Sequence, residues 1–144
     1  MPATIKREDF RFMVVDDFAT MRRIISGLVR ELGFHHIVEA ENGRAALRGL
    51  ERSAQSGEPV HFVLSDINMP VMNGFELLEA LQGKPETDTL RKLPVLLVTA
   101  EARKEDIIRA ARLGAAGYVV KPFSKDTIGD KIHLALKHRH LFVD

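Results

Sequence analysis

Cysteine is absent from this chain of 144 residues. Without a thiol the protein has no disulfide framework, no thiolate nucleophile and no cysteine-ligated metal. Long apolar runs are absent too, since none approaches the roughly 20 residues that cross a bilayer, and the N-terminal segment lacks the apolar stretch of a signal peptide. We therefore expect a soluble cytoplasmic protein with no membrane association.

An excess of charge of one sign is also missing. The chain carries 21 basic and 20 acidic residues, a formal net charge of +1, and the two signs are mixed along the sequence. This balance marks no surface for nucleic acid. Internal repeats, low-complexity tracts and interdomain linkers are absent as well. A hydrophobic content of 45% is enough for one packed core, so we expect one domain spanning residues 1–144.

Short apolar runs alternate with segments of helical period, which is typical of βα units and a parallel sheet. The expected strands are Phe12–Val15, Ile37–Ala40, Phe62–Ser65, Val95–Thr99 and Gly117–Val120. The expected helices run from Met21 to Leu32 with Gly33 as the stop, and over Gly43–Ser53, Gly74–Gln82, Lys104–Leu113 and Ser124–His138. The fold class is therefore α/β, with five βα units.

Polar residues follow three of these strands directly. Asp16 and Asp17 follow the first strand, Asp66 the third, and Lys121 the fifth. Since the carboxyl ends of parallel strands line one crevice, we expect three carboxylates and one ammonium to converge there. Crowded carboxylates need a proton or a cation, and an all-oxygen site favours Mg²⁺. One carboxylate would then be free to attack phosphorus and form an aspartyl phosphate.

Each residue also has a structural interpretation when taken alone. Asp16 or Asp17 could cap the first helix, and Asp66 could cap a turn closed by Pro70. Lys121 could be an ordinary solvated lysine. Only the shared position at strand ends favours a site over these alternatives.

Four motifs resemble the signature positions of the two-component response-regulator receiver family. They are Val14–Asp17, Ser65–Gly74, Val98–Ala100 and Val120–Phe123, in register across about residues 10 to 139 with short extensions at both ends. The resemblance implies a flavodoxin-like (βα)5 doubly wound five-stranded parallel sheet of order 2-1-3-4-5. Within the family, the chain closely resembles the CheY-like chemotaxis regulators, although Ile67 stands where the best-studied of these have tryptophan.

The resemblance also implies a role for each site residue. Asp66 would accept a phosphoryl group. Asp17, Asp66 and the Asn68 main-chain carbonyl would ligate Mg²⁺ directly, with Asp16 acting mainly through water. Thr99 and Lys121 would hold phosphoryl oxygens, the side chains of Asn68 and Glu101 would flank the path of the hydrolytic water, and a cis peptide would precede Pro122.

A switch and a partner surface are implied in the same way. Tyr118 would turn inward when phosphate draws in Thr99, a shift between two existing packings. The output surface would comprise the fourth helix, fifth strand and fifth helix. Its matching residues are Lys104, Ile107, Ala111, Tyr118, Val120, Phe123 and Lys131.

The implied function is that of a signalling switch and not of an enzyme. A CheA-like histidine kinase would phosphorylate the protein, a FliM-like flagellar motor switch protein would bind it as a monomer, and a phosphatase is a further possible partner. The alternative is a stand-alone receiver that passes phosphate along a relay or serves as a phosphate sink.

A Mg²⁺-dependent aspartyl-phosphate phosphatase is a third hypothesis. Haloacid-dehalogenase-like enzymes of this kind carry an Asp-x-Asp motif on the first strand, where this chain has Asp16-Asp17-Phe18. A cap domain for substrate selection is also missing. The histidines at positions 35, 36, 133, 138 and 140 lack the i, i+4 spacing that presents two imidazoles on one helix face. We expect residues 138–144 to be a frayed end, with docking of Leu141 and Phe142 on a neighbour as the alternative.

Overall fold

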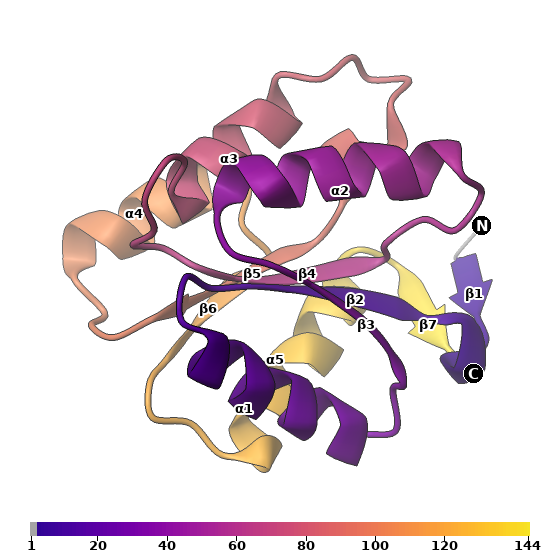
Figure 1. Cartoon of the computed structure of the whole chain (residues 1–144), viewed down its shortest axis with the longest axis horizontal. Coiled ribbons are helices and arrows are strands. Elements are labelled where there is room, and N and C mark those ends of the chain that lie inside the picture. The colour runs from indigo at the N-terminus through magenta and orange to yellow at the C-terminus, as the bar shows by residue number, and fades with distance from the viewer. Residues whose placement is uncertain (1–2) are drawn as a thin grey trace.

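The computed structural model describes residues 3–144, in which five helices cover the two faces of one parallel sheet (Figure 1). The strands are β1 (Ala3–Ile5), β2 (Arg11–Val15), β3 (His36–Ala40), β4 (Phe62–Asp66), β5 (Val95–Thr99), β6 (Gly117–Val120) and β7 (Leu141–Val143). The helices are α1 (Ala19–Glu31), α2 (Gly43–Gln55), α3 (Gly74–Gln82), α4 (Lys104–Arg112) and α5 (Lys125–His138), with short 3-10 turns η1 (Arg7–Asp9) and η2 (Thr89–Lys92).

The central sheet has five parallel strands in the order β3-β2-β4-β5-β6. Leaving β1 aside, this is the order 2-1-3-4-5, so the predicted flavodoxin-like fold is confirmed. The register places Val15 beside both Ala40 and Ser65, and Asp66 beside Val98. The strand ends that carry Asp16 and Asp66 are therefore neighbours.

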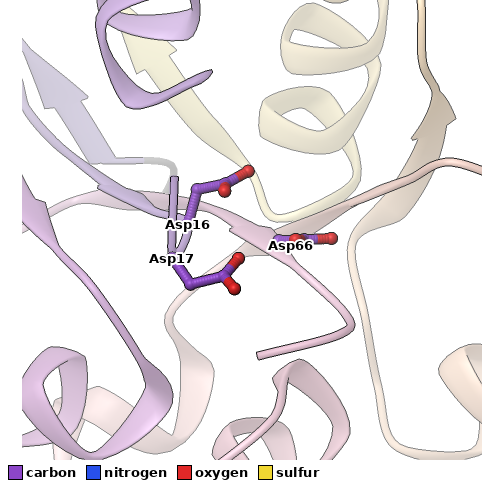
Figure 2. A group of neighbouring side chains, drawn as sticks. All are labelled: Asp16, Asp17 and Asp66. Atoms are coloured by element: carbon purple, nitrogen blue, oxygen red, sulfur yellow. The ribbon is translucent and has the colours of Figure 1, made fainter. Parts of the chain in front are cut away.

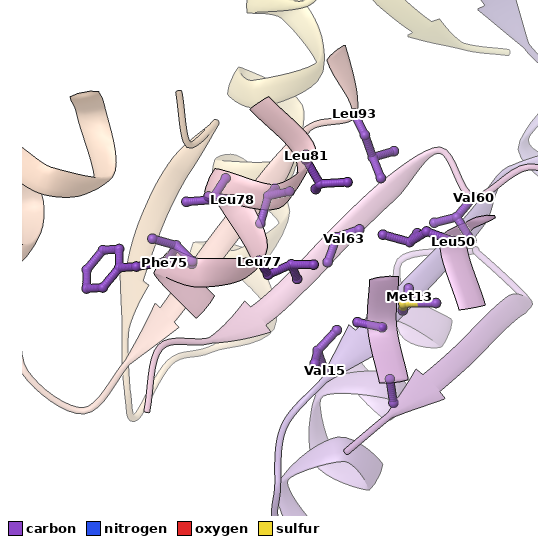
Figure 3. Packing of buried hydrophobic residues seen from close by; sticks show 14 of the residues in the cluster. Met13, Val15, Leu50, Val60, Val63, Phe75, Leu77, Leu78, Leu81 and Leu93 are labelled. Carbon is purple, nitrogen blue, oxygen red and sulfur yellow. The ribbon is translucent and has the colours of Figure 1, made fainter. Parts of the chain in front are cut away.

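Two hydrophobic layers enclose the sheet because successive strand residues point to opposite faces. On one face, α2, α3 and α4 pack against alternate residues such as Met13, Val15 and Val63 (Figure 3). On the other face, α1 and α5 pack against Phe12 and Val14 and their neighbours. The three central strands β2, β4 and β5 are buried on both faces, which explains their almost continuous apolar runs, whereas the edge strands β3 and β6 carry exposed residues.

The helices begin and end near the predicted residues for identifiable reasons. Gly33 and Gly114 adopt φ values of 97° and 78° just after α1 and α4, a conformation that a side chain disfavours. Ser124 accepts a hydrogen bond from the Thr127 amide and caps α5. No helix in the described residues 3–144 has the length and apolar content needed to span a membrane.

The prediction of a frayed C-terminal end is wrong. Leu141–Val143 forms β7, which pairs in parallel with β1 near the end of α5 (Figure 1). The amide of Asp144 donates to Ile5, and the amide of Arg7 donates to the main-chain oxygen of Asp144, both at 2.9 Å. The two ends of the described chain thus hold each other, a contact that neither segment could reveal on its own.

Candidate functional site

Three carboxylates meet at the edge of the sheet where the strands end, which we call the carboxyl edge. Asp16 and Asp17 directly follow β2, and Asp66 is the last residue of β4. One oxygen from each lies within 4.8 Å of the other two (Figure 2). Asp16 is fully buried and Asp66 is 7% exposed. The structure therefore brings the three acidic residues together, as predicted.

Lys121 brings a positive charge to the same cluster. It follows β6, its amide donates to the carbonyl of Thr99 at 2.7 Å, and the peptide bond to Pro122 is cis, as predicted. Its Nζ lies 3.2 Å from Asp16 Oδ2 and 3.8 Å from Asp66 Oδ2. One ammonium thus bridges two buried carboxylates, and the shorter contact is to Asp16 and not to Asp66.

One ammonium does not balance three carboxylates. Burial raises the pKa of the Asp66 carboxyl above its ordinary value, and the neighbouring Asp16 and Asp17 add to this effect, while Lys121 and the Ile67 amide oppose it. Asp17 Oδ1 is a buried atom with no hydrogen-bond partner among the described residues. A buried polar oxygen of this kind is normally satisfied. The cluster therefore fits a hard divalent cation with oxygen ligands.

Main-chain hydrogen bonds orient the two buried carboxylates. The amide of Phe18 donates to Asp16 Oδ1 at 2.9 Å, and the amide of Ile67 donates to Asp66 Oδ1 at 2.8 Å. Helix α1 has Phe18 as its N-cap with no side-chain cap bond, so neither Asp16 nor Asp17 caps it. In each buried carboxylate, the other oxygen faces Lys121.

Arg22 is a supporting residue that the sequence did not single out. Its Nη1 donates to the Asp16 carbonyl at 2.8 Å, and its Nε donates to Glu39 at 3.0 Å. It thereby ties the end of β2 to α1 and β3. The available signal was an arginine in the first turn of a helix that follows the acidic pair.

The segment after Asp66 approaches it closely because Gly74 has no side chain. A Cβ at Gly74 would lie 2.5 Å from the Asp66 carbonyl oxygen, too close for any other residue. Asn73 and Glu76 form a capping box that starts α3. In the loop between Asp66 and α3, Val71 has a φ of 70°, which is unfavourable for a β-branched residue.

A polar cavity of about 480 Å³ opens beside the carboxylates. Asn68, Thr99 and Glu101 line it, so the structure brings these three predicted site residues together. The Thr99 hydroxyl donates to the Glu101 carbonyl at 2.8 Å. The Glu101 carboxylate instead pairs with Arg103 Nε at 2.8 Å, a contact that the sequence analysis missed.

The predicted output residues lie on α4, β6 and α5, except for Phe123, which lies in the loop between β6 and α5. Tyr118 is half-buried and shares a small cavity of about 10 Å³ with Thr99 and Ile107. Lys131 Nζ lies 5.3 Å from the centre of the Tyr118 ring. The accessibility of the others differs, since Lys104, Ala111 and Val120 are exposed and Phe123 is partly buried.

With this fold and this site, residues 12–133 match the response regulator receiver domain, and the chain belongs to that family. Receiver domains act as signalling switches and bind Mg²⁺ at an acidic pocket. The chain is 47% identical over 122 residues to the chemotaxis protein CheY of Pseudomonas aeruginosa, covering 85% of this chain and 92% of that one. It is 43% identical over 128 residues to CheY-3 of Vibrio cholerae, covering 89% and 92%.

A solved structure shows the same likeness. The chemotaxis protein CheY4 of Vibrio cholerae superimposes with a TM-score of 0.76 at 28% identity, covering 88% of this chain and 98% of that one. The resemblance inferred from the four motifs is confirmed by these matches.

Proposed function

We propose that Asp66 is the phosphoacceptor of a chemotaxis response regulator. The observation that carries this proposal is the cluster of Asp16, Asp17 and Asp66, bridged by Lys121 at the carboxyl edge. Asp66 Oδ2 faces Lys121 and accepts no hydrogen bond from the main chain, so it is the oxygen that would attack. The whole chain, residues 1–144, would act as a single receiver domain with its core at about residues 10–139.

The reaction would be a direct transfer. Asp66 Oδ2 attacks phosphorus, a new O–P bond forms, and the bond from phosphorus to the imidazole nitrogen of a kinase breaks, with the electron pair leaving on that nitrogen. The Lys121 ammonium and the Thr99 hydroxyl would hold the phosphoryl oxygens. Each of the two groups donates a hydrogen bond to a protein partner in this structure and would exchange it for one to a phosphoryl oxygen.

Asp17, Asp66 and the Asn68 main-chain carbonyl would hold Mg²⁺, with Asp16 contributing mainly through water. The orphaned Asp17 Oδ1 supports this assignment. When bound, the ion supplies positive charge that stabilises the transferring phosphoryl group. The side chains of Asn68 and Glu101 would flank the water that later hydrolyses the aspartyl phosphate.

Phosphorylation would act on the partner surface through Thr99. Its hydroxyl would exchange its hydrogen bond to the Glu101 carbonyl for one to a phosphoryl oxygen. The Tyr118 ring would then turn inward, into the space that Thr99 vacates. This is a shift in population between two packings. The surface affected comprises Lys104, Ile107, Ala111, Tyr118, Val120, Phe123 and Lys131.

The partners follow from the relatives and from this surface. Relatives named as chemotaxis proteins support a CheA-like histidine kinase as donor and a FliM-like motor switch protein as target. The regulator would act as a monomer in the cytoplasm. Large apolar side chains are exposed on the same three elements: Ile108 by 42%, Val120 by 36% and Leu134 by 51%. Such side chains suit a peptide partner with its own apolar anchors.

Intact-mass spectrometry with acetyl phosphate tests the chemistry. Wild type should gain one phosphoryl mass only with Mg²⁺, Asp66→Asn should gain none, and Asp130→Asn, which removes an exposed carboxylate on α5, should behave as wild type. An adduct on Asp66→Asn would refute the assignment of the acceptor.

Binding of beryllofluoride-treated protein to a motor-switch peptide tests the use of the signal. Binding that requires beryllofluoride would support the chemotaxis role. Phosphorylation without peptide binding, together with transfer to a histidine phosphotransfer domain, would favour the relay or sink.

A further inference from the structure

A second cavity lies away from the carboxylates, between the C-terminal half of α5, the end of α1 and β7. Its volume is about 600 Å³. Both ends of the described chain contribute to it, through Arg7 and through Leu141–Val143. These residues lie outside the receiver match, which covers residues 12–133. The cavity therefore depends on segments that the shared receiver fold does not include.

The interior of the cavity is apolar. Leu32 and Phe34 line it from the α1 side, Ile132 and Leu136 from α5, and Phe142 from β7. Ile132 and Leu136 are buried at 3% and 7% exposure, whereas Phe142 is 45% exposed. When an apolar group covers an apolar wall and a partly exposed aromatic ring, the burial of that surface lowers the free energy.

The polar side chains that line this cavity are basic, and no acidic side chain of the described residues is among them. They are Arg7, His133 and Lys137. Arg7 is held in place, because its Nη1 donates to the Leu32 carbonyl at 2.8 Å and its guanidinium lies 4.5 Å from the centre of the Phe34 ring. Lys137 forms no ion pair within residues 3–144.

We propose that this cavity binds a small amphiphilic anion, with an apolar chain against α5 and Phe142 and a carboxylate at Arg7 and Lys137. The volume lies within the roughly 300–1,000 Å³ typical of small-molecule sites. Among the described residues, the side chains that line the cavity include basic groups and no acidic group, which gives charge complementarity to a carboxylate and disfavours a cation. This site is independent of the phosphorylation chemistry, since it shares no residue with the carboxyl edge.

Decanoate is a suitable probe, studied below its micelle concentration by isothermal titration and by amide chemical shifts of the full chain. We expect saturable one-to-one binding, with shifts centred on Leu32, Ile132 and Phe142. Decanol and decyltrimethylammonium should bind more weakly. Lys137→Glu should weaken decanoate binding about tenfold, because it reverses a charge near the carboxylate. Lys125→Glu changes the same charge at the other end of α5 and should leave the affinity unchanged.

Several results would overturn the proposal. Decanoate that fails to saturate or shifts other residues would remove the site. Equal binding of decanol, an unaltered Lys137→Glu variant, or an equal loss in Lys125→Glu would show that the basic groups do not select an anion. Dimerisation that Phe142→Asp abolishes would assign the apolar wall to a second copy of the chain instead.

Discussion

The carboxyl edge of the central sheet, where its strands end, differs from the amino edge, where they begin. The difference lies in how completely the side chains at each place are paired or packed. At the carboxyl edge, three carboxylates share one ammonium, and one buried oxygen has no partner among the described residues. At the amino edge, the Phe12 ring lies 5.1, 4.8 and 5.4 Å from the rings of Phe10, Phe34 and Phe62. The first arrangement leaves electrostatic conflict, and the second is a packed aromatic core.

Titratable groups show the same contrast. At the amino edge, His61 accepts a hydrogen bond from the Arg11 amide at 2.9 Å, and burial together with Arg11 lowers the pKa of its imidazole. The neutral ring is therefore the form that fits. At the carboxyl edge the proposed reaction requires the ionised form of Asp66, although burial disfavours it. Unfavourable electrostatics are therefore concentrated where the proposed function needs charge, and the opposite edge supplies stability.

The largest effect is expected from breaking the amino edge. Phe12→Ala removes a fully buried ring and should lower the free energy of unfolding by about 3–5 kcal/mol, measured in urea. Phe18→Ala is the matched change beside the carboxyl edge, where the ring is 67% exposed, and should cost less than about 0.5 kcal/mol. Similar costs for both variants would contradict the contrast between the edges.

Removing the Lys121 ammonium should increase the repulsion among the carboxylates at the carboxyl edge. Lys121→Met leaves the buried carboxylates without their ammonium and should cost about 2 kcal/mol at neutral pH without divalent ions. Lys84→Met is a close control, because Lys84 is equally buried and pairs with Glu51 at 3.0 Å on the surface. It should cost less than about 1 kcal/mol. Added Mg²⁺ should stabilise the Lys121 variant more than the Lys84 variant, because only the former has lost the ammonium that offsets the carboxylates.

Removing a carboxylate should relieve the conflict in a pH-dependent way. Because the pKa of Asp66 is raised in the folded state, the folded carboxyl keeps its proton to a higher pH than the unfolded one. Wild type should therefore lose stability as the pH rises above 3.8, the ordinary value. Asp66→Asn lacks this loss. Denaturation curves should therefore show that its free energy of unfolding rises relative to that of wild type as the pH approaches neutral. Parallel pH profiles would contradict this account.

The smallest effect concerns the backbone beside the site. Val71→Gly removes a β-branched side chain at a φ of 70°, and the relief outweighs the added freedom of glycine in the unfolded chain by about 0.5 kcal/mol. His140→Gly, at a φ of 54° and away from the site, should gain less because histidine tolerates this region better. Thermal unfolding resolves both, and a loss of stability in Val71→Gly would contradict the assignment of strain.

The sequence predicted the central sheet closely because most of its strands are short apolar runs bounded by polar or turn-forming residues. Each of the five strands begins and ends within one residue of its predicted bounds. The carboxylate cluster was predictable for the same reason, since parallel strands place their ends together. Side-chain partners were less accessible, because the Glu101–Arg103 pair and the reach of Arg22 depend on rotamers that no spacing rule fixes.

The two short strands were beyond prediction for a different reason. Ala3–Ile5 is too short for its hydrophobic period to be measured, and the residues between α5 and Leu141–Val143 include no clear turn signal in the sequence. Their pairing depends on where the rest of the fold places both segments, which is a tertiary effect.

The pairing of β1 with β7 also has a kinetic consequence. Thr4 and Phe142 are register partners, so this ladder closes a loop that contains nearly the entire chain. Loop closure of that length costs entropy that local contacts do not, and it becomes favourable only after the intervening units have folded. The ladder should therefore form last and open first. In hydrogen exchange, the amides of Arg7 and Asp144 would report subglobal opening at the chain ends, while the amides of β2 and β4 would report global unfolding.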